Sequence, residues 1–448
     1  MDTGLAVDRV AAGSPTAAGG TARLFLFALV LVVAAEAIGT VSIPLGPGKI
    51  VLLPLLWALL LGAAIGLASR RLPGPLAVSP AQQHLAAAYL QPALLIFIAK
   101  LGLLVGGSLP KILASGWALV FQEFGHFFGT MVFGLPVALL LGIKREAIGA
   151  TFSVGREPSL AIIGERFGMD SPEGRGVLAE YLTGTVFGAV FIALLAGLIT
   201  SLNLFNPLAL AMGAGVGSGS MMAAASAAIA AQQTPEVAKD VATFAAASNL
   251  ITTTIGTYFT LFLSLPFTIW AYNRLEPLIG RTRRQEEAAP AETGPAPHEE
   301  PALGTPALIL AWVLIGAYGL IGNRLTYGTA PDAAVIGGMA IIIAVVLAGW
   351  ALYRLAGRRL PAVIWVSLIG MALTHPAMPF SADIAALTGK VNFLALATPI
   401  LAFAGLSIAK DVPAFRRLGW RIVVVSFMAN AGTFLGAALI AQFWLHAV

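Results

Sequence analysis

The chain has 448 residues, of which 58% are hydrophobic and only 10% charged. A soluble globular chain carries about a quarter of its residues as charges, so this composition indicates an integral membrane protein. Apolar runs of about 20 residues indicate helices rather than a β-barrel. The absence of cysteine excludes disulfides and thiolate metal sites. The net charge of +5 does not indicate nucleic-acid binding, because the basic residues gather at the ends of apolar runs.

The apolar runs predict an all-α polytopic membrane protein with about 12–13 transmembrane segments. A polar N-terminal tail of residues 1–20 precedes the first run, which we interpret as a retained helix. Residues 21–275 form an N-terminal membrane block and residues 306–448 a C-terminal membrane block. Between them, residues 276–305 are rich in Pro, Ala and Glu without an apolar period, which predicts a disordered linker.

Lysine and arginine cluster at 70–71, 144–145, 274–284, 354–359 and 410–421. With thirteen spans and a cytoplasmic N-terminus, every cluster falls on the cytoplasmic side, as the positive-inside rule requires. We therefore expect a multi-pass protein of the bacterial inner (plasma) membrane. Its N-terminus and the 276–305 linker are expected in the cytoplasm.

An internal repeat relates residues 102–130 to residues 405–433 without gaps. The identical pairs include Gly102/Gly405, Pro110/Pro413, Trp117/Trp420, Gly129/Gly432 and Thr130/Thr433. The charge pattern places the two copies in opposite orientations across the membrane. The sequence therefore predicts an inverted repeat, a common architecture of secondary transporters.

The predicted helix at 146–166 is interrupted by SVGREPS. Gly155 weakens a helix, Pro158 removes a backbone donor, and the adjacent charges of Arg156 and Glu157 are costly in lipid. We interpret this segment as a discontinuous helix whose break faces a polar cavity. A solvated loop between two short helices is the alternative that the sequence leaves open.

A second interruption, GAGVGSGSMM, divides the predicted helix at 207–231. Its glycines allow close approach of the backbone to a ligand, and its serines supply hydroxyl groups. Close helix packing through small residues is the alternative. From the two breaks we expect a substrate-binding site made of Ser153, Gly155, Arg156, Ser159, Gly217, Ser218, Gly219 and Ser220.

Four polar residues are candidates for the coupling ion or proton, namely Glu157, Glu180, Ser248 and Asn249. Hydroxyl and amide oxygens can coordinate sodium, and a buried glutamate can carry a proton. Hydroxyl side chains also bond their own helix, which leaves a structural role open. Glu123 and His126 lie three residues apart on one predicted helix, where a proton relay and an interhelical clasp are both open.

The whole chain resembles an uncharacterised bacterial membrane family, domain of unknown function 3100, in ATFSVGREPSLAIIGERFG, DSPEGRGVLAEYLTGTVFG and GSGSMMAAASAAIAA. Over about 100–270 the chain more distantly resembles the sodium/glutamate and 2-hydroxycarboxylate symporters. That resemblance implies a scaffold, a mobile core with two broken helices, and transport of small carboxylates with sodium or protons. The glycine–histidine motif of the glutamate symporters is replaced by SVGREPS.

These observations favour a secondary active transporter of a small organic anion or amino acid, working by alternating access at the broken helices. Its coupling ion would be Na⁺ or H⁺, with no cofactor, no bound metal and no nucleic-acid partner. The lipid bilayer is its surroundings, and a homodimer is expected from the scaffold architecture of such proteins. A passive channel or facilitator and an intramembrane enzyme are the alternatives. No HExxH or GxSxG motif is present, so we expect no enzyme activity.

Overall fold

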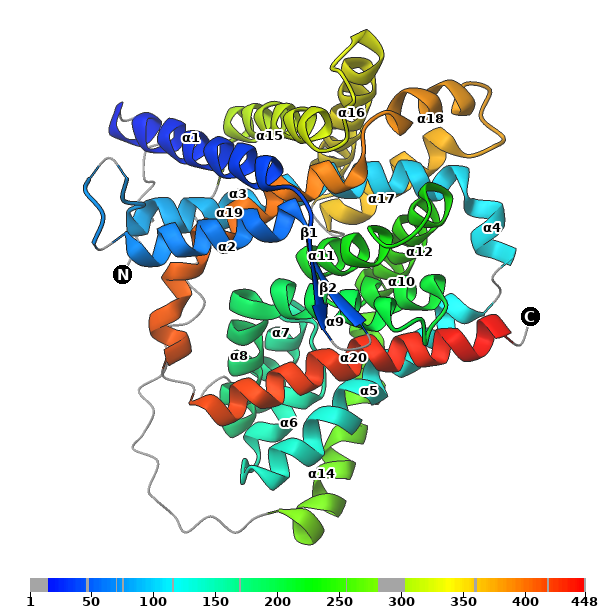
Figure 1. Cartoon of the computed structure of the whole chain (residues 1–448). Coiled ribbons are helices and arrows are strands. Elements are labelled where there is room, and N and C mark those ends of the chain that lie inside the picture. Colours follow the sequence, from blue (N-terminus) through cyan, green and yellow to red (C-terminus); the bar gives the residue numbers. More distant parts are fainter. Residues whose placement is uncertain are drawn as a thin grey trace, which may run out of the picture.

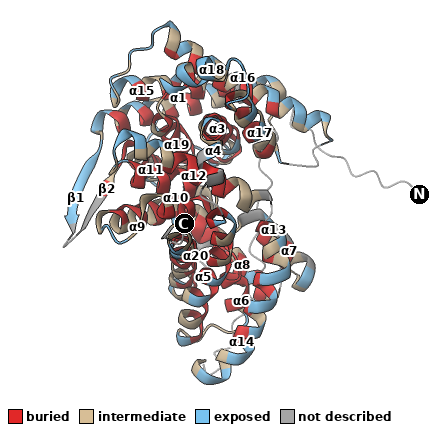
Figure 2. Ribbon diagram, turned by 90° about the vertical axis from the view of Figure 1, so that its right-hand side faces the viewer, coloured by how far each residue is buried: buried red, intermediate tan, exposed pale blue. Residues whose placement is uncertain are grey.

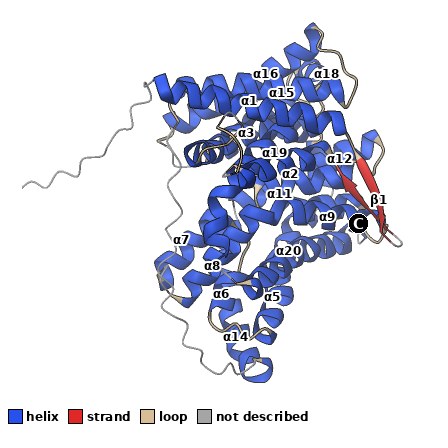
Figure 3. Cartoon of the chain, turned by 60° about the vertical axis from the view of Figure 1, so that its left-hand side comes forward, coloured by secondary structure: helices blue, strands red, loops and turns tan. Residues whose placement is uncertain are grey.

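A computed structural model describes residues 15–45, 48–69, 71–74, 76–114, 117–168, 171–254, 256–280, 303–357, 361–416 and 419–446. Almost every described residue belongs to a helix, apart from one β-hairpin and short connections (Figure 3). The side chains of Arg156 and Glu157 lie outside the description. So does most of the predicted linker, residues 281–302.

The elements of the first half (Figure 1) are α1 (Pro15–Ile38), β1 (Val41–Leu45), β2 (Gly48–Leu52), α2 (Pro54–Ala68), α3 (Pro80–Gly107), α4 (Leu109–Ala114), α5 (Ala118–Leu140), α6 (Glu146–Thr151), α7 (Arg156–Phe167), α8 (Pro172–Thr183), the π-helix η1 (Gly184–Gly188), α9 (Ala189–Ser201), α10 (Pro207–Gly215) and α11 (Gly219–Ala230). They continue with α12 (Pro235–Thr254), α13 (Gly256–Phe259), the π-helix η2 (Thr260–Ser264), α14 (Leu265–Ile279), α15 (Thr305–Leu325), α16 (Ala333–Leu355), α17 (Ala362–Thr374), α18 (Ser381–Gly389), α19 (Phe393–Arg416) and α20 (Trp420–His446).

Eight helical stretches among the described residues are long and apolar enough to cross a membrane. Seven belong to α1, α3, α5, α15, α16, α19 and α20, and the eighth runs through α8, η1 and α9. The apolar helices α2, α11 and α17 are shorter. The fold class predicted from the sequence, an all-α multi-pass membrane protein, is confirmed. Fewer long helices are found than predicted segments, because several predicted segments divide into shorter helices.

The apolar segment predicted at 48–68 is one that divides. Its first residues form strand β2, which pairs antiparallel with β1 between Val41↔Leu52 and Leu45↔Gly48. Helix α2 begins only at Pro54, where the fixed φ of proline suits a first turn. At the end of α1, Gly39 takes a φ of +72° and lets the chain turn into the hairpin. Figure 3 shows the hairpin at one edge of the helical body.

Burial is concentrated in the helices that lie inside the bundle, notably α3, α10, α11 and α19 (Figure 2). Outer helices expose large apolar side chains instead, such as Leu26 and Val30 on α1 and Phe443 on α20. Exposed apolar side chains of this size are favourable in contact with lipid and unfavourable in contact with water. The arrangement fits a protein with a close-packed interior and an apolar perimeter.

Helices α5 and α20 make the most extensive contact between two helices of the described residues, and glycines let them pack closely. A Cβ atom on Gly125 would lie 2.1 Å from the carbonyl oxygen of Gly436, and one on Gly129 would lie 2.1 Å from that of Gly432. The residue numbers of the contacting glycines increase along α5 while they decrease along α20, so the two helices are antiparallel. Beside the glycines, the hydroxyls of Thr130 and Thr433 are 2.5 Å apart. The pair uses GxxxG spacing on both helices, which is typical of close packing in membranes.

Two further helix pairs repeat one packing pattern. A Cβ atom on Gly102 of α3 would lie 2.9 Å from the carbonyl oxygen of Ser367 on α17, and one on Gly405 of α19 would lie 2.4 Å from that of Leu59 on α2. Without gaps, α2 and α17 also share Trp57/Trp365, Leu60/Leu368, Gly62/Gly370 and Ala64/Ala372. The N-terminal and C-terminal membrane blocks therefore interlock, because α2 packs on α19, α3 on α17, and α5 on α20.

Candidate functional site

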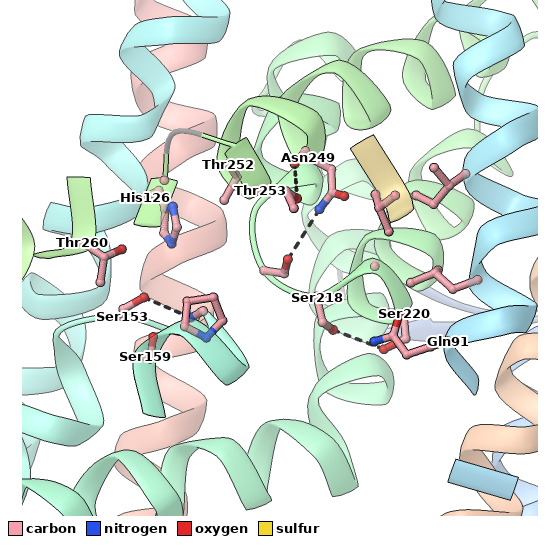
Figure 4. Close-up of a pocket in the computed structure, with 18 of the residues that line it drawn as sticks. Gln91, His126, Ser153, Ser159, Ser218, Ser220, Asn249, Thr252, Thr253 and Thr260 are labelled. Atoms are coloured by element: carbon pink, nitrogen blue, oxygen red, sulfur yellow. Dashed lines mark hydrogen bonds between the residues drawn. The ribbon is translucent and has the colours of Figure 1, made fainter. Parts of the chain in front are cut away.

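A cavity of about 220 Å³ lies where α3, α5, α12 and the starts of α7 and α11 meet (Figure 4). The share of liquid volume of one water is about 30 Å³, so the cavity has room for a small organic solute. Its polar lining consists of Gln91, His126, Ser153, Ser159, Ser218, Ser220, Asn249, Thr252, Thr253 and Thr260, together with Gly155, Gly217, Gly219 and Gly256. Its apolar lining consists of Leu90, Leu94, Ile98, Pro158, Val363 and Ile400.

The first break in the chain lies between α6 and α7. Helix α6 ends at Thr151, and helix α7 begins at Arg156 with Gly155 as its N-cap. Between them, the Ser153 hydroxyl accepts a hydrogen bond from the Gly155 amide at 3.0 Å, and the Phe152 carbonyl accepts one from the Ser264 hydroxyl. The break is thus held in place by its own hydroxyl and by the π-helix η2. In the first turn of α7, Pro158 has no amide hydrogen and the Ser159 amide donates to the Gly155 carbonyl at 2.8 Å. The amides of Arg156 and Glu157 are therefore the ones that the helix itself does not bond.

The second break lies between α10 and α11. Gly217 takes a φ of +102°, which L side chains rarely adopt, and Ser218 caps α11 by accepting from the Met221 amide at 3.3 Å. The Asn249 amide donates to the Gly215 carbonyl at 2.8 Å and approaches that of Gly217 at 3.5 Å. Asn249 therefore fixes the shape of this break from the neighbouring helix α12.

The two breaks belong to units of similar build. The N-caps of α7 and α11 are Gly155 and Ser218, and the caps of the next helices lie at Ser171 and Thr234. The separation from Gly155 to Ser171 equals that from Ser218 to Thr234. Ser171 and Thr234 each begin a Ser/Thr-Pro-Glu sequence. In both units the N-terminus of the helix after the break lines the same cavity. The positive ends of these two helix dipoles favour a negative charge there.

Two buried polar atoms at the cavity have no hydrogen-bond partner among the described residues. They are the hydroxyl of Ser159, whose side chain is fully buried, and Nε2 of His126. Figure 4 shows both side chains on the same side of the cavity, near Ser153. A buried polar group without a partner is costly, so such atoms in a polar cavity point to a ligand or to water.

The structure brings most of the predicted site residues together. Seven of the eight predicted substrate-binding residues line the cavity, and they come from both breaks, namely Ser153, Gly155, Ser159, Gly217, Ser218, Gly219 and Ser220. The eighth, Arg156, and the predicted coupling residue Glu157 begin helix α7 at the cavity, and their side chains lie outside the description. Asn249 also lines the cavity.

Two predicted coupling residues lie elsewhere. The Ser248 hydroxyl donates to the Met212 carbonyl at 2.7 Å and ties α12 to α10. Glu180 is buried on α8 and accepts from the Asn430 amide of α20 at 3.3 Å. Neither residue is among those that line the cavity. Their side chains are directed to neighbouring helices, α10 for Ser248 and α20 for Glu180.

Gln91 and Thr260 were not predicted to belong to the site. Gln91 reaches the cavity from α3, one residue before Pro92, and Thr260 does so from η2. An isolated glutamine or threonine in an apolar run carries no positional signal in the sequence. His126 was singled out as a polar residue within a predicted span, but nothing in the sequence joined it to the breaks.

Among the described residues, no group of three or more His, Cys, Asp or Glu side chains is arranged to hold a metal ion. The lining of hydroxyls, amides and helix N-termini suits a small polar or anionic organic solute better. Comparison with curated proteins and with solved structures finds no match. A match to a family profile spans residues 33–274, which include both breaks and α5. The chain therefore belongs to the family described as protein of unknown function (DUF3100).

Proposed function

We propose that the protein is a secondary active transporter of a small organic anion or amino acid, coupled to an ion or a proton. The observation that carries this proposal is the convergence of two helix N-termini on one cavity inside a multi-pass membrane protein. Each helix N-terminus is equivalent to roughly half a positive charge, and its free amides point along the helix axis. Two of them at one cavity favour a bound anion.

The lining residues suggest how an anion would be held. The amides at the starts of α7 and α11 and the hydroxyls of Ser159 and Ser220 are donors for carboxylate oxygens. In this proposal Arg156 supplies the charged partner from the first turn of α7. The apolar side of the cavity, with Leu94 and Ile98, would face the hydrocarbon part of the solute.

An inverted repeat supports alternating access. Gly129 and Thr130 of α5 are identical in the sequence repeat to Gly432 and Thr433 of α20, and these equivalent residues touch one another. Equivalent helices of an inverted repeat run in opposite directions, and antiparallel packing of α5 on α20 fits a pseudo-two-fold axis between them. The equivalent packing of Gly102 on α17 and Gly405 on α2 supports the same relation.

In this proposal the interrupted segments 146–167 and 207–230 are discontinuous helices of a mobile core, and α2, α3, α17 and α19 form a scaffold. The polar break of each core segment faces the cavity, where backbone groups can be satisfied without lipid contact. In the same proposal the protein lies in the bacterial inner membrane, and the charge distribution favours a cytoplasmic N-terminus and a cytoplasmic 276–305 linker. A homodimer through the scaffold is part of the same proposal.

Ligand-dependent stability tests the proposal. Purified protein is heated with a panel of organic acids and amino acids, with and without sodium and at two pH values. A ligand at 100 times its dissociation constant stabilises the native state by about 2.7 kcal/mol, which raises the melting temperature visibly. Stabilisation by one class of carboxylate supports the proposal, and silence across the whole panel contradicts it.

Two variants place the bound ligand. Ser159→Ala removes a cavity hydroxyl that has no protein partner among the described residues, and Ser407→Ala removes a buried hydroxyl that donates to its own helix at the Ala404 carbonyl. We expect Ser159→Ala and Arg156→Ala to reduce the ligand-dependent shift and Ser407→Ala to leave it unchanged. Equal effects of the two serine variants would mean that the ligand binds elsewhere. Uptake against a concentration gradient in proteoliposomes then separates a transporter from a passive channel.

A further inference from the structure

A buried acid–histidine pair on α5 lies against the cavity. Glu123 and His126 are 1% and 2% exposed, and His126 Nδ1 is 3.3 Å from Glu123 Oε2. The Glu123 carboxylate also accepts from the Gln122 amide at 2.7 Å and from the Thr252 hydroxyl of α12. In both of these contacts the Glu123 carboxylate is the acceptor, which is the role of an ionised carboxylate. Because an ionised carboxylate has no hydrogen to donate, Nδ1 of His126 carries the hydrogen of their shared bond.

This arrangement leaves Nε2 of His126 without a hydrogen, and the lone pair of this nitrogen faces the cavity. The atom is buried and has no hydrogen-bond partner among the described residues. The ring is held in position, because it stacks on Phe127 with a centroid distance of 4.5 Å, and Phe127 stacks on Phe259 of α13 at 5.5 Å. Figure 4 shows the ring directed into the cavity between Thr252 and Thr260.

The elements around α5 bring few other charges to the ring. Within the described part of the chain, the hydrogen bonds and ion pairs of the His126 side chain involve Glu123 alone. On helix α12 the neighbouring polar side chain is Thr252, which donates to Glu123. On helix α20 it is Thr433, whose hydroxyl bonds that of Thr130 and not the ring.

Three titratable side chains belong to other elements near the cavity. Glu180 of α8 is directed to Asn430 of α20. Arg156 and Glu157 belong to the first turn of α7, and their side chains lie outside the description. The fixed partner of His126 is therefore Glu123, and the side of the ring away from Glu123 is open to the cavity.

We propose that His126, held by Glu123, reversibly binds a proton from the cavity at Nε2 and that organic anions bind to the protonated form. The second half of this statement rests on the proposed function. With His126 neutral, the pair carries one negative charge in a site of low dielectric, and this charge repels an incoming anion. Protonation makes the pair neutral overall and turns Nε2 from an acceptor into a donor. The coupling charge thus lies on α5 rather than on Glu157 or Glu180.

The sign of the pH dependence follows. Binding of an anion with one proton is tightest at low pH and weakens by about tenfold per pH unit above the midpoint of the His126 titration. By linkage, a bound anion raises that midpoint. Glu123→Gln removes the carboxylate that holds Nδ1 of His126.

The test is a titration of the full-length protein in lipid nanodiscs, with isotope-labelled histidine followed by ¹⁵N ring shifts between pH 5 and 9. His126→Gln assigns the His126 signals by their loss. We expect a neutral ring protonated on Nδ1 at high pH and an imidazolium at low pH. His375→Gln is the matched control, because His375 lies in a turn and contacts the Ala377 amide. A ring that keeps one protonation state over this range, or that carries its hydrogen on Nε2 when neutral, overturns the proton site.

The coupling is tested with an equimolar mixture of acetate, succinate, malate, glutamate and citrate. We expect the mixture to raise the His126 midpoint and to stabilise the wild type more at low pH, and we expect His126→Gln to bind without pH dependence. Equal stabilisation of the wild type at both pH values refutes the coupling while the proposed function stands. A ring that titrates as expected in a protein that the mixture never stabilises supports the proton site and counts against the proposed function.

Discussion

Replacing Gly129 with alanine tests the packing that joins the two repeats. A Cβ at this position would lie 2.1 Å from the Gly432 carbonyl oxygen, whereas real Cβ contacts essentially never fall below 3.0 Å. Both contacting groups are backbone, so no side-chain rotation relieves the overlap, and α5 and α20 must part by about 1 Å. The separation also stretches the hydrogen bond between Thr130 and Thr433, which is 2.5 Å long.

The energetic cost has a definite sign. Alanine is favoured over glycine in a helix interior by about 1 kcal/mol, so propensity alone predicts stabilisation. Overpacking of a close-packed interior costs about 1–3 kcal/mol, and an interhelical hydrogen bond in a membrane contributes about 0.6 kcal/mol more. Because these losses exceed the gain, we expect Gly129→Ala to lower the free energy of unfolding by about 0.5–2.5 kcal/mol.

Gly337→Ala is the matched control, since it makes the same change inside helix α16 where nothing lies within 4 Å of the new Cβ. We expect this variant to be as stable as the wild type or more stable by up to about 1 kcal/mol. Unfolding of both variants in the same detergent, followed by tryptophan fluorescence, gives the comparison. If Gly129→Ala and Gly337→Ala unfold together, the close antiparallel contact of α5 and α20 is incorrect.

Three further substitutions have defined outcomes. Asn249→Leu leaves the Gly215 carbonyl without its donor, and we expect a loss of about 1–3 kcal/mol in unfolding experiments together with weaker ligand-dependent stabilisation. Glu36→Gln is expected to change stability by less than about 1 kcal/mol, because one carboxylate oxygen has no partner among the described residues and the other accepts from a hydroxyl. Arg145→Ala is expected to destabilise more than Glu173→Gln, since it leaves a carboxylate that is 2% exposed without its guanidinium, and chemical unfolding of the two variants ranks them.

The membrane class and the interrupted helices could be predicted because each has a strong local signal. Apolar runs set the spans, and the coincidence of Gly155, Pro158 and adjacent charges within one run marked a break. The grouping of both breaks at one cavity could not be derived, because it depends on how α3, α5 and α12 pack around them. Asn249 lines the cavity, whereas the side chain of Ser248, the preceding residue, faces α10.

The hairpin at 41–52 shows why some boundaries were not predicted. Residues 48–53 are as apolar as a span, but Pro44 and the glycines at 46 and 48 favour a turn that hydropathy alone does not register. The pairing of α2 with α19 was equally hidden. The sequence signal for this pairing is the similarity of α2 to α17. That similarity becomes recognisable only in the structure, where Gly102 of α3 packs on α17 and Gly405 of α19 packs on α2 in the same way.

The most direct test of the account is uptake of radiolabelled solutes by the purified protein in proteoliposomes, which also registers the electroneutral movement of an anion with a proton. Members of the organic acid and amino acid panel are added one at a time, and saturable uptake is expected for one class of carboxylate. Uptake should be strongly reduced in Ser159→Leu, which fills the cavity, and retained in Ser407→Ala. Saturable uptake at an equal rate in Ser159→Leu, or no uptake of any solute by a protein that remains folded, would contradict transport through this cavity.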